Sequence, residues 1–240
     1  KEKIDGLVMD LRGNGGGHLS EATGLVGLFI RGGPVVQLRE TGGRIEVLDD
    51  PEPGEVWDGP VVVLVDRSSA SASEIFAAAI QDYGRGLIIG QQTYGKGTVQ
   101  NLYPLDRYAL GSEPGFGQLT VTIGKFYRVT GESTQHRGVL PDIQLPSAIS
   151  TEEVGESTRE SALPWDRIRP ATFGKDADFK QAFTQLASEH DQRIAKDADF
   201  QFLVREIGAY EQERAEKSVS LNLKTRVAER ETLQNERLRS

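Results

Sequence analysis

The sequence predicts an α/β fold with an appended helical region. Residues 61–65 form a wholly apolar, β-branched run, which is typical of a strand buried on both faces of a parallel or mixed sheet. Residues 72–83 are rich in helix formers, and residues 87–90 form a second apolar run. Strand, helix and strand in this order predict a right-handed crossover between parallel strands.

The other elements of this core are predicted from shorter patterns. Residues 4–9 are mostly apolar and precede a glycine-rich segment, so we expect a core strand there. Residues 118–129 alternate between apolar and polar types, as a half-buried strand does, and a turn follows at Thr130-Gly131.

The composition changes from about Pro146. Serine, glutamate and threonine dominate as far as Ser161, which favours a linker. Residues 178–194 and 197–216 then show helical spacing of apolar side chains, and the highly charged residues 224–239 are a further candidate helix.

Composition limits the function classes. The 240 residues, 37% hydrophobic and 27% charged, suffice for one core with a smaller attached unit. A net charge of -8 argues against nucleic acid as a partner. No apolar run reaches the roughly 18 residues of a membrane-spanning helix. Without cysteine or a His-Glu-x-x-His motif, neither zinc nor thiol chemistry has support, and we expect no metal and no cofactor.

Ser71 and Lys96 are the candidate reactive pair, and Lys96 follows Ser71 by twenty-five positions. No histidine lies within fifty residues of Ser71, since His18 and His136 are the nearest on either side. A serine activated by a lysine is therefore a more economical hypothesis than a Ser/His pair. The three histidines, His190 included, are better explained by structural or surface roles.

The predicted position of Ser71 is the turn between a strand and a helix. Unpaired backbone N–H groups and the positive end of the helix dipole at such a turn suit an oxyanion. The segment Ser71-Ala72-Ser73-Glu74 also matches a capping box, in which Ser71 and Glu74 only satisfy helix N–H groups. Both interpretations stay open on this segment alone.

Lys96 lies between two glycines in a predicted loop after the strand at residues 87–90. A lysine amine becomes a usable base only where burial lowers its pKa. A solvated surface lysine is the alternative.

A glycine-rich segment, Asp10-Leu11-Arg12-Gly13-Asn14-Gly15-Gly16-Gly17, follows the first predicted strand. Successive glycines allow close approach of the backbone to a ligand and turn N–H groups inward. Neither phosphate-loop nor dinucleotide spacing is present. A second oxyanion donor or a plain flexible loop remain as explanations.

Four motifs occur in the order found in the carboxy-terminal processing serine peptidases, which are also called tail-specific proteases. The chain resembles the long Gram-negative form of this family. The motifs are the glycine-rich segment, Ser69-Ala70-Ser71-Ala72-Ser73-Glu74, Gly95-Lys96-Gly97-Thr98-Val99-Gln100, and Gly131-Glu132-Ser133-Thr134-Gln135 with Gly138-Val139-Leu140-Pro141-Asp142-Ile143. Two further segments, residues 153–157 and 162–166, resemble the C-terminal extension of that form. The resemblance implies a ClpP/crotonase-like spiral ββα protease core at residues 1–147, a linker at 148–163 and a helical extension at 164–240.

The resemblance also implies site residues. Ser71 is then the nucleophile, Lys96 the general base and Gln100 the residue that orients the amine. The oxyanion hole would use the N–H groups of Ala72 and of Gly16 or Gly17. The family usually has proline where this chain has Gly15, which leaves the donating glycine open.

Asp82 is the acidic residue that descriptions of the family add to the catalytic set. A rise of about 1.5 Å per residue places it roughly 16 Å along the helix from Ser71. We therefore expect Asp82 to hold the Lys96 loop or the helix end in place through a hydrogen bond or ion pair.

The implied activity is endopeptidase cleavage of proteins selected by apolar C-terminal tails, in the periplasm. Relatives carry an N-terminal helical region and a PDZ domain that binds the tail as an added strand, and neither is visible in this chain. An adaptor protein and peripheral association with the inner membrane are further implied partners. Two alternatives remain: a non-catalytic scaffold that binds proteins, and a crotonase-like acyl-CoA enzyme.

Overall fold

The computed structural model describes residues 4–108, 115–175 and 180–239. The chain forms two compact units, each treated by itself below. Unit 1 comprises Lys1–Leu145 with Ile149–Gln185, and unit 2 comprises Pro146–Ala148 with Leu186–Ser240.

The first sheet of unit 1 is wholly parallel and has the strand order β1-β4-β5-β8. Its strands are β1 (Leu7–Asp10), β4 (Val61–Val65), β5 (Leu87–Gly90) and β8 (Ile143–Gln144). The prediction of strand, helix and parallel strand around Ser71 is confirmed, with helix α2 (Ala72–Asp82) between β4 and β5.

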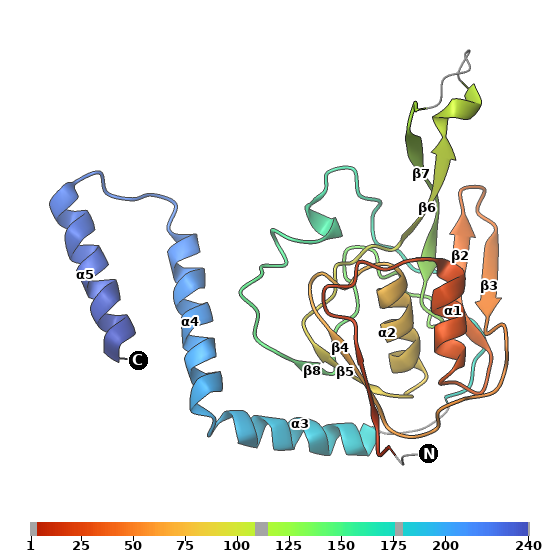
Figure 1. The fold of residues 1–240 in the computed structure, drawn as a ribbon, viewed down its shortest axis with the longest axis horizontal. Helices are drawn as coiled ribbons and strands as arrows, with labels where there is room; N and C mark the ends of the chain where they lie inside the picture. The colour runs from red at the N-terminus through yellow and green to blue at the C-terminus, as the bar shows by residue number, and fades with distance from the viewer. Residues whose placement is uncertain (1–3, 109–114, 176–179, 240) are drawn as a thin grey trace. The chain divides into compact units, whose positions relative to one another are not determined.

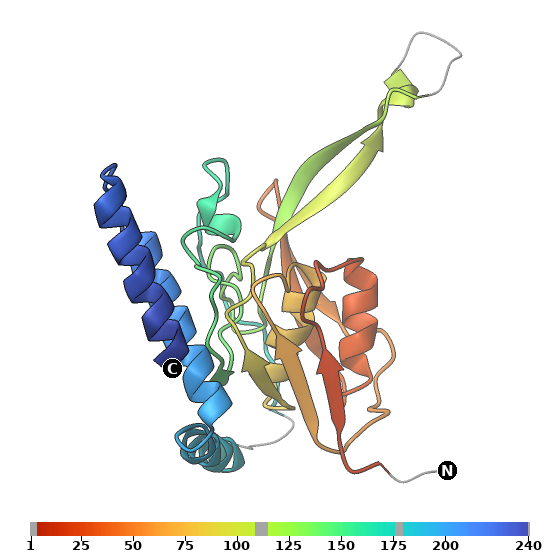
Figure 2. The same cartoon turned by 60° about the vertical axis from the view of Figure 1, so that its left-hand side comes forward.

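One detail of the β4 prediction is wrong. Val61, Val63 and Val65 are buried, but the alternate residues Val62 and Leu64 are only half-buried. Helices pack on one face of this sheet, and the opposite face also leaves Val8 of β1 64% exposed (Figure 2). The apolar run reflects a parallel strand that is covered fully on one side.

The second sheet is antiparallel and has the order β3-β2-β7-β6. Its strands are β2 (Pro34–Glu40), β3 (Ile45–Asp49), β6 (Thr98–Pro104) and β7 (Gln118–Tyr127). Strand β7 confirms the strand predicted at residues 118–129, but its burial does not alternate: residues 118–122 are exposed and residues 124–127 are buried. Strands β6 and β7 continue beyond the sheet as a two-stranded ribbon that ends at the short 3-10 helix η1 (Leu105–Tyr108) (Figure 2).

Two helices join the sheets into one core. Helix α1 (Leu19–Gly27) packs against α2, and α2 contacts β5 of the first sheet and β2 of the second (Figure 1). The buried face of α2 includes Phe76, whose ring meets that of Phe29 edge-on at 5.7 Å. Burial of a side chain of this size stabilises a fold by about 1.5–3 kcal/mol. This packing fixes the N-terminus of α2, where Ser71 lies.

Residues 149–175 run along unit 1 with one short 3-10 turn, η2 (Glu156–Thr158). Ile168 N–H donates to the Gly131 carbonyl at 2.8 Å, and Ala171 N–H donates to the Val129 carbonyl at 2.9 Å. Asp166 accepts hydrogen bonds from Arg39, Lys125 and Tyr127 of the second sheet. The shortest of the three, from the Lys125 amine, measures 2.5 Å. Both the predicted linker and the start of the predicted extension lie in this segment.

The helices predicted after residue 178 are present. They are α3 (Lys180–Ile194), α4 (Ala198–Ala215) and α5 (Leu223–Arg239), and residues 178–179 of the first prediction lie outside the described residues. Asp197 caps α4 by accepting a hydrogen bond from Phe200 N–H at 3.0 Å. Among the described residues, no helix combines the length and apolar character needed to cross a membrane.

Candidate active site

Ser71 is the N-cap of α2 and has an unusual backbone conformation. Its φ of 57° and ψ of -115° lie where residues other than glycine rarely occur. Such strain costs on the order of 1–3 kcal/mol and persists only where surrounding contacts impose it. One such contact is the hydrogen bond from Ser71 N–H to Glu74 Oε2 at 2.8 Å. The fold therefore holds Ser71 at the sharp strand-to-helix turn that the sequence predicts.

Glu74 connects this turn to the Lys96 loop. Its carboxylate also accepts hydrogen bonds from Thr93 Oγ1 at 2.5 Å, from Gly95 N–H at 2.7 Å and from Lys96 N–H at 2.9 Å. The predicted cap is thus confirmed for the Glu74 side chain, and the same carboxylate also reaches a loop about twenty positions away. Sequence spacing gave no signal for these further contacts.

The Glu74 side chain is fully buried, and this burial raises its pKa to about 7. The four hydrogen bonds that the carboxylate accepts act in the opposite direction, because they favour the ionised form. Burial outweighs them. The carboxylate that ties the two loops together therefore titrates near neutral pH.

The opposite side of the Lys96 loop rests on residues 135–136. Gly97 N–H donates to Gln135 Oε1 at 2.7 Å, and His136 N–H donates to the Gly95 carbonyl at 2.8 Å. Gly95 has a φ of +90°, and a Cβ there would come within 2.8 Å of the His136 backbone. Glycine is therefore required at this position, which explains one of the two glycines around Lys96.

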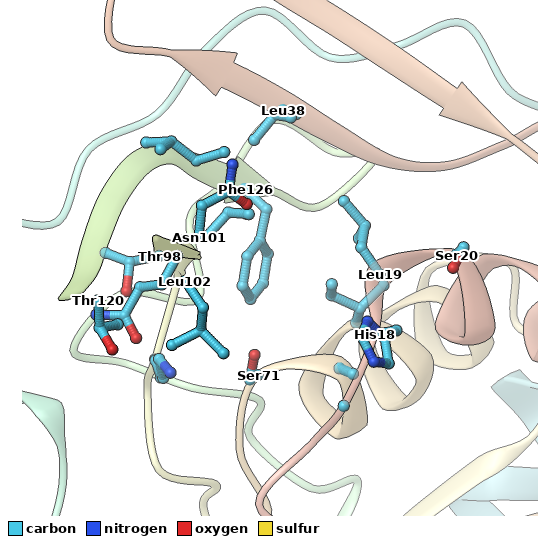
Figure 3. Close-up of a pocket in the computed structure, with 17 residues that line it drawn as sticks. His18, Leu19, Ser20, Leu38, Ser71, Thr98, Asn101, Leu102, Thr120 and Phe126 are labelled. Atoms are coloured by element: carbon cyan, nitrogen blue, oxygen red, sulfur yellow. The ribbon is translucent and has the colours of Figure 1, made fainter. Parts of the chain in front are cut away.

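Ser71, Lys96 and Gln100 line one cavity of about 570 Å³. Figure 3 shows Ser71 at this cavity, with Leu38, Leu102 and Phe126 on one side and His18 and Leu19 on the other. Lys96 is half-buried. Among the described residues no hydrogen bond joins its amine to Ser71, and catalytic hydrogen bonds are often long before substrate binds.

Gln100 lies in β6, so the segment from Lys96 to Gln100 is extended and not helical. The Gln100 amide donates a long hydrogen bond of 3.5 Å to Thr122 Oγ1 of β7. A register shift between Val99 and Gln100 interrupts the pairing of β6 with β7 at this point. Lys96 and Gln100 line the same cavity, and no hydrogen bond joins them among the described residues.

The glycine-rich segment is fastened to the Ser71 turn. Asp66, directly after β4, accepts hydrogen bonds from Gly13 N–H at 3.0 Å and from Ser69 N–H at 3.0 Å. Ala70 N–H donates to the Asn14 carbonyl at 3.0 Å. The segment is thus part of the site's framework, which argues against the plain flexible loop.

The candidate oxyanion donors differ in availability. Gly16 N–H already donates to Asn14 Oδ1 at 2.9 Å. By contrast, Gly17 N–H and Ala72 N–H have no hydrogen-bond partner within the described ranges, and both residues line the Ser71 cavity. Gly16 has another role, because a Cβ there would lie 2.6 Å from the Ala70 carbonyl oxygen and 2.9 Å from Ser71 Cβ. The geometry therefore favours Gly17 over Gly16 as the second donor.

Asp82 is not brought together with Ser71 and Lys96. It is the last residue of α2, and its carboxylate accepts two hydrogen bonds from Arg128, from Nη2 at 2.5 Å and from Nε at 3.0 Å. Burial raises the pKa of Asp82, although the Arg128 guanidinium acts to lower it. Of the two anchoring roles expected, holding the helix end matches these contacts.

His18 is a cavity residue that sequence reasoning placed elsewhere. It is the N-cap of α1 and lines the same cavity as Ser71 (Figure 3). Its position directly after the glycine-rich segment was a usable signal. His136 supports the Lys96 loop through its backbone, and His190 meets the Phe200 ring edge-on in unit 2. Within the described residues, no group of three or more His, Cys, Asp or Glu side chains could hold a metal ion.

Comparison with known proteins gives two family matches. Residues 1–145 match peptidase family S41, and residues 149–240 match the C-terminal domain of tail specific protease. A tail-specific protease of Haemophilus influenzae is 47% identical over 232 residues, which cover 95% of this chain and 33% of that protein. A carboxy-terminal-processing protease of Bartonella bacilliformis is 38% identical over 143 residues, covering 59% of this chain and 31% of that protein.

A solved structure supports the same relationship. The photosystem II D1 C-terminal processing protease superposes with a TM-score of 0.51 at 32% identity, covering 62% of this chain and 36% of that one. The chain spans about a third of the length of these relatives. The predicted resemblance and the α/β fold class are confirmed. The chain belongs to peptidase family S41, and its residues 149–240 belong to the family of tail-specific protease C-terminal domains.

Proposed function

We propose that the protein is a serine endopeptidase in which Ser71 is the nucleophile and Lys96 the general base. The observation that carries this proposal is the shared anchoring of the two residues. Ser71 N–H and Lys96 N–H donate to the same oxygen of Glu74, and both side chains line one cavity. Nucleophile and base are thereby held in one site without a bond between them.

The reaction follows from these positions. The Lys96 amine takes the proton of Ser71 Oγ, and Oγ attacks the carbonyl carbon of the scissile peptide bond. Ala72 N–H and Gly17 N–H stabilise the resulting oxyanion at the positive end of α2. The Lys96 ammonium gives its proton to the leaving nitrogen, and water then hydrolyses the acyl-enzyme by the same steps. Gln100, which lines the same cavity as Lys96, orients the amine.

The substrates that we propose are proteins with apolar C-terminal tails. In support, apolar side chains make up about half of the residues that line the Ser71 cavity, with Leu19, Leu38 and Phe126 among them. The relatives' names describe tail-specific and carboxy-terminal processing activity. A periplasmic location, a tail-binding PDZ domain, an adaptor protein and peripheral contact with the inner membrane belong to the same proposal.

The test uses the full-length protein and an unfolded substrate with an apolar C-terminus. We expect Ser71→Ala and Lys96→Ala each to abolish cleavage, while circular dichroism shows an unchanged fold. His18→Gln is the matched variant for the competing Ser/His mechanism, because His18 lines the same cavity. Undiminished cleavage by Lys96→Ala, with loss in His18→Gln, would reverse the assignment of the base.

Other outcomes separate the remaining alternatives. Binding of the substrate without cleavage by the wild type would favour the protein-binding scaffold. Turnover of an acyl-CoA thioester without peptide cleavage would favour the crotonase-like enzyme, a hypothesis that gives no role to Lys96 and Gln100.

A further inference from the structure

A second cavity, of about 400 Å³, borders the catalytic pair. Lys96 and Gln100 line both this cavity and the Ser71 cavity. Lys96 and Gln100 therefore lie between the two cavities. An extended peptide with its scissile bond at Ser71 that runs past Lys96 would place the side chains near that bond in the second cavity.

The far wall of the second cavity comes from outside the S41 match. Val154, Glu156 and Arg159 line it, and all three lie within the region that matches the tail-specific C-terminal domain family. This wall belongs to unit 1 together with the rest of the cavity.

Buried hydrogen bonds hold this wall in place. Arg67 is 2% exposed and donates from Nε to the Val154 carbonyl at 2.6 Å and from Nη1 to the Thr93 carbonyl. Gly155 has a φ of +139° and lies so close to Arg67 that a Cβ would overlap the guanidinium. Glu156 N–H donates to the Tyr94 carbonyl at 3.1 Å. These contacts fix the position of the wall in the absence of substrate.

Arg159 is the cation that this wall presents to the cavity. Its Nε donates to the Tyr94 hydroxyl at 3.2 Å, and its side chain remains 65% exposed. The carboxylate of Glu156 approaches only to 4.0 Å, and Glu156 also accepts a hydrogen bond from Gln135 Nε2. The terminal amino groups of Arg159 have no hydrogen-bond partner in the described part of the chain.

The charges around the cavity favour an anion. Two guanidinium groups, of Arg67 and Arg159, line the cavity together with the single carboxylate of Glu156. The Arg67 guanidinium already donates hydrogen bonds to backbone carbonyl groups. A guanidinium with free terminal N–H groups binds a carboxylate through two parallel hydrogen bonds. A carboxylate in this cavity would thus meet an available donor pair and a net positive field.

We propose that Arg159 is a specificity-determining residue that binds a carboxylate of the substrate beside the scissile bond. The carboxylate is supplied either by an acidic side chain of the substrate or by a free C-terminus close to the cleaved bond. This inference rests on the proposed peptidase function and adds to it a role for the segment that begins the C-terminal domain.

The experiment compares the full-length wild type with Arg159→Gln and Arg159→Lys on fluorogenic peptides. One series places Glu or Gln singly at each of three positions on either side of the scissile bond. A second series compares a free C-terminus with a C-terminal amide. Arg44→Gln is the control, because Arg44 is exposed in the β2–β3 turn and lines neither cavity.

We expect the wild type to prefer one carboxylate-bearing peptide about five- to tenfold in kcat/KM, and this preference to weaken as salt rises. Arg159→Gln should abolish the preference while it leaves cleavage of the all-neutral peptide unchanged. Arg159→Lys should keep part of it, and Arg44→Gln all of it. Glu156→Gln should strengthen it, because the competing carboxylate is removed. The series that shows the preference identifies the source of the carboxylate.

Two results would overturn the inference separately from the proposed function. Equal cleavage of Glu and Gln peptides and of acid and amide peptides by the wild type would refute the carboxylate site while peptidase activity stands. An unchanged preference in Arg159→Gln would assign it to another residue. Absence of cleavage of every peptide in both series by the wild type would instead refute the peptidase function itself.

Discussion

Asp82→Asn distinguishes a structural from a catalytic role for this residue. Asp82 and Arg128 form a buried ion pair with side chains only 6% and 16% exposed, and two hydrogen bonds join them. The substitution removes the negative charge and leaves the guanidinium largely buried. Arg128 keeps its hydrogen bond from Nη2 to Gln81 Oε1 at 2.9 Å, and the amide oxygen of the variant side chain is available to accept one more.

The expected loss in free energy of unfolding is large for the removal of a single charge. Breaking a buried ion pair on one side typically costs about 3–5 kcal/mol, and the remaining bond to Gln81 favours the lower end, about 3 kcal/mol. For a unit of this size, each kcal/mol lowers the midpoint of thermal unfolding by about 2–4 °C, so we expect a decrease of about 6–12 °C. Because Asp82 lies at the far end of α2 from Ser71, kcat/KM of the folded enzyme should change less than about twofold.

The assay combines thermal unfolding followed by circular dichroism with peptide cleavage well below both midpoints. Asp58→Asn is the control, because Asp58 is exposed. The double variant Asp82→Leu with Arg128→Met should recover much of the lost stability, because it removes both desolvated charges together. A hundredfold loss of kcat with unchanged stability would refute this reasoning and place Asp82 in the reaction.

Two further predictions concern the framework of the site. Gly16→Ala should unfold or inactivate the protein, because the added Cβ would overlap Ala70 and crowd Ser71. Gly15→Ala should be tolerated, since nothing lies within 4 Å of a Cβ at that position. The unfolding midpoints and cleavage rates of the two variants check this prediction. The folded pKa of Glu74, about 7, exceeds its ordinary value of 4.5, so its contribution to stability is fully present below about pH 4.5 and is lost as pH rises through about 7. The unfolding free energy of the wild type should therefore fall by about 2.5 kcal/mol between pH 5 and 8 through this one group, and Glu74→Gln should lack this decrease when both proteins are measured by urea denaturation. An identical pH dependence in both proteins would contradict the prediction.

Local sequence signals suffice for the elements around Ser71. The apolar run of β4, the helix formers of α2 and the apolar run of β5 each act within their own segment, so the crossover could be predicted with accurate bounds. Strand β6 is different. Most of its residues are exposed, and its pairing with β7 defines it, so no apolar alternation marks it in the sequence. Strand β8 has two residues and depends wholly on pairing with β5.

The same distinction applies to the site. Ser71 and Glu74 stand three positions apart, so the capping box could be predicted from spacing alone. The bonds from Glu74 to the Lys96 loop depend on how β5 returns beside α2, and no spacing rule gives them. Likewise, the contact of Arg67 with Val154 joins residues 87 positions apart. Only the folded chain shows that residues beyond the S41 match line the cavity beside Lys96.

The arrangement of Glu74 has a consequence for the catalytic pair as a whole. The ionised carboxylate accepts hydrogen bonds from the Ser71 turn and from the Lys96 loop at once. A protonated carboxyl group accepts fewer, because one oxygen becomes a donor that faces other donors. Protonation would therefore loosen nucleophile and base together, and not one of them alone. Ser71 and Lys96 share no direct bond among the described residues, so the charge of this buried side chain, together with the contacts of the Lys96 loop to Gln135 and His136, contributes to their alignment.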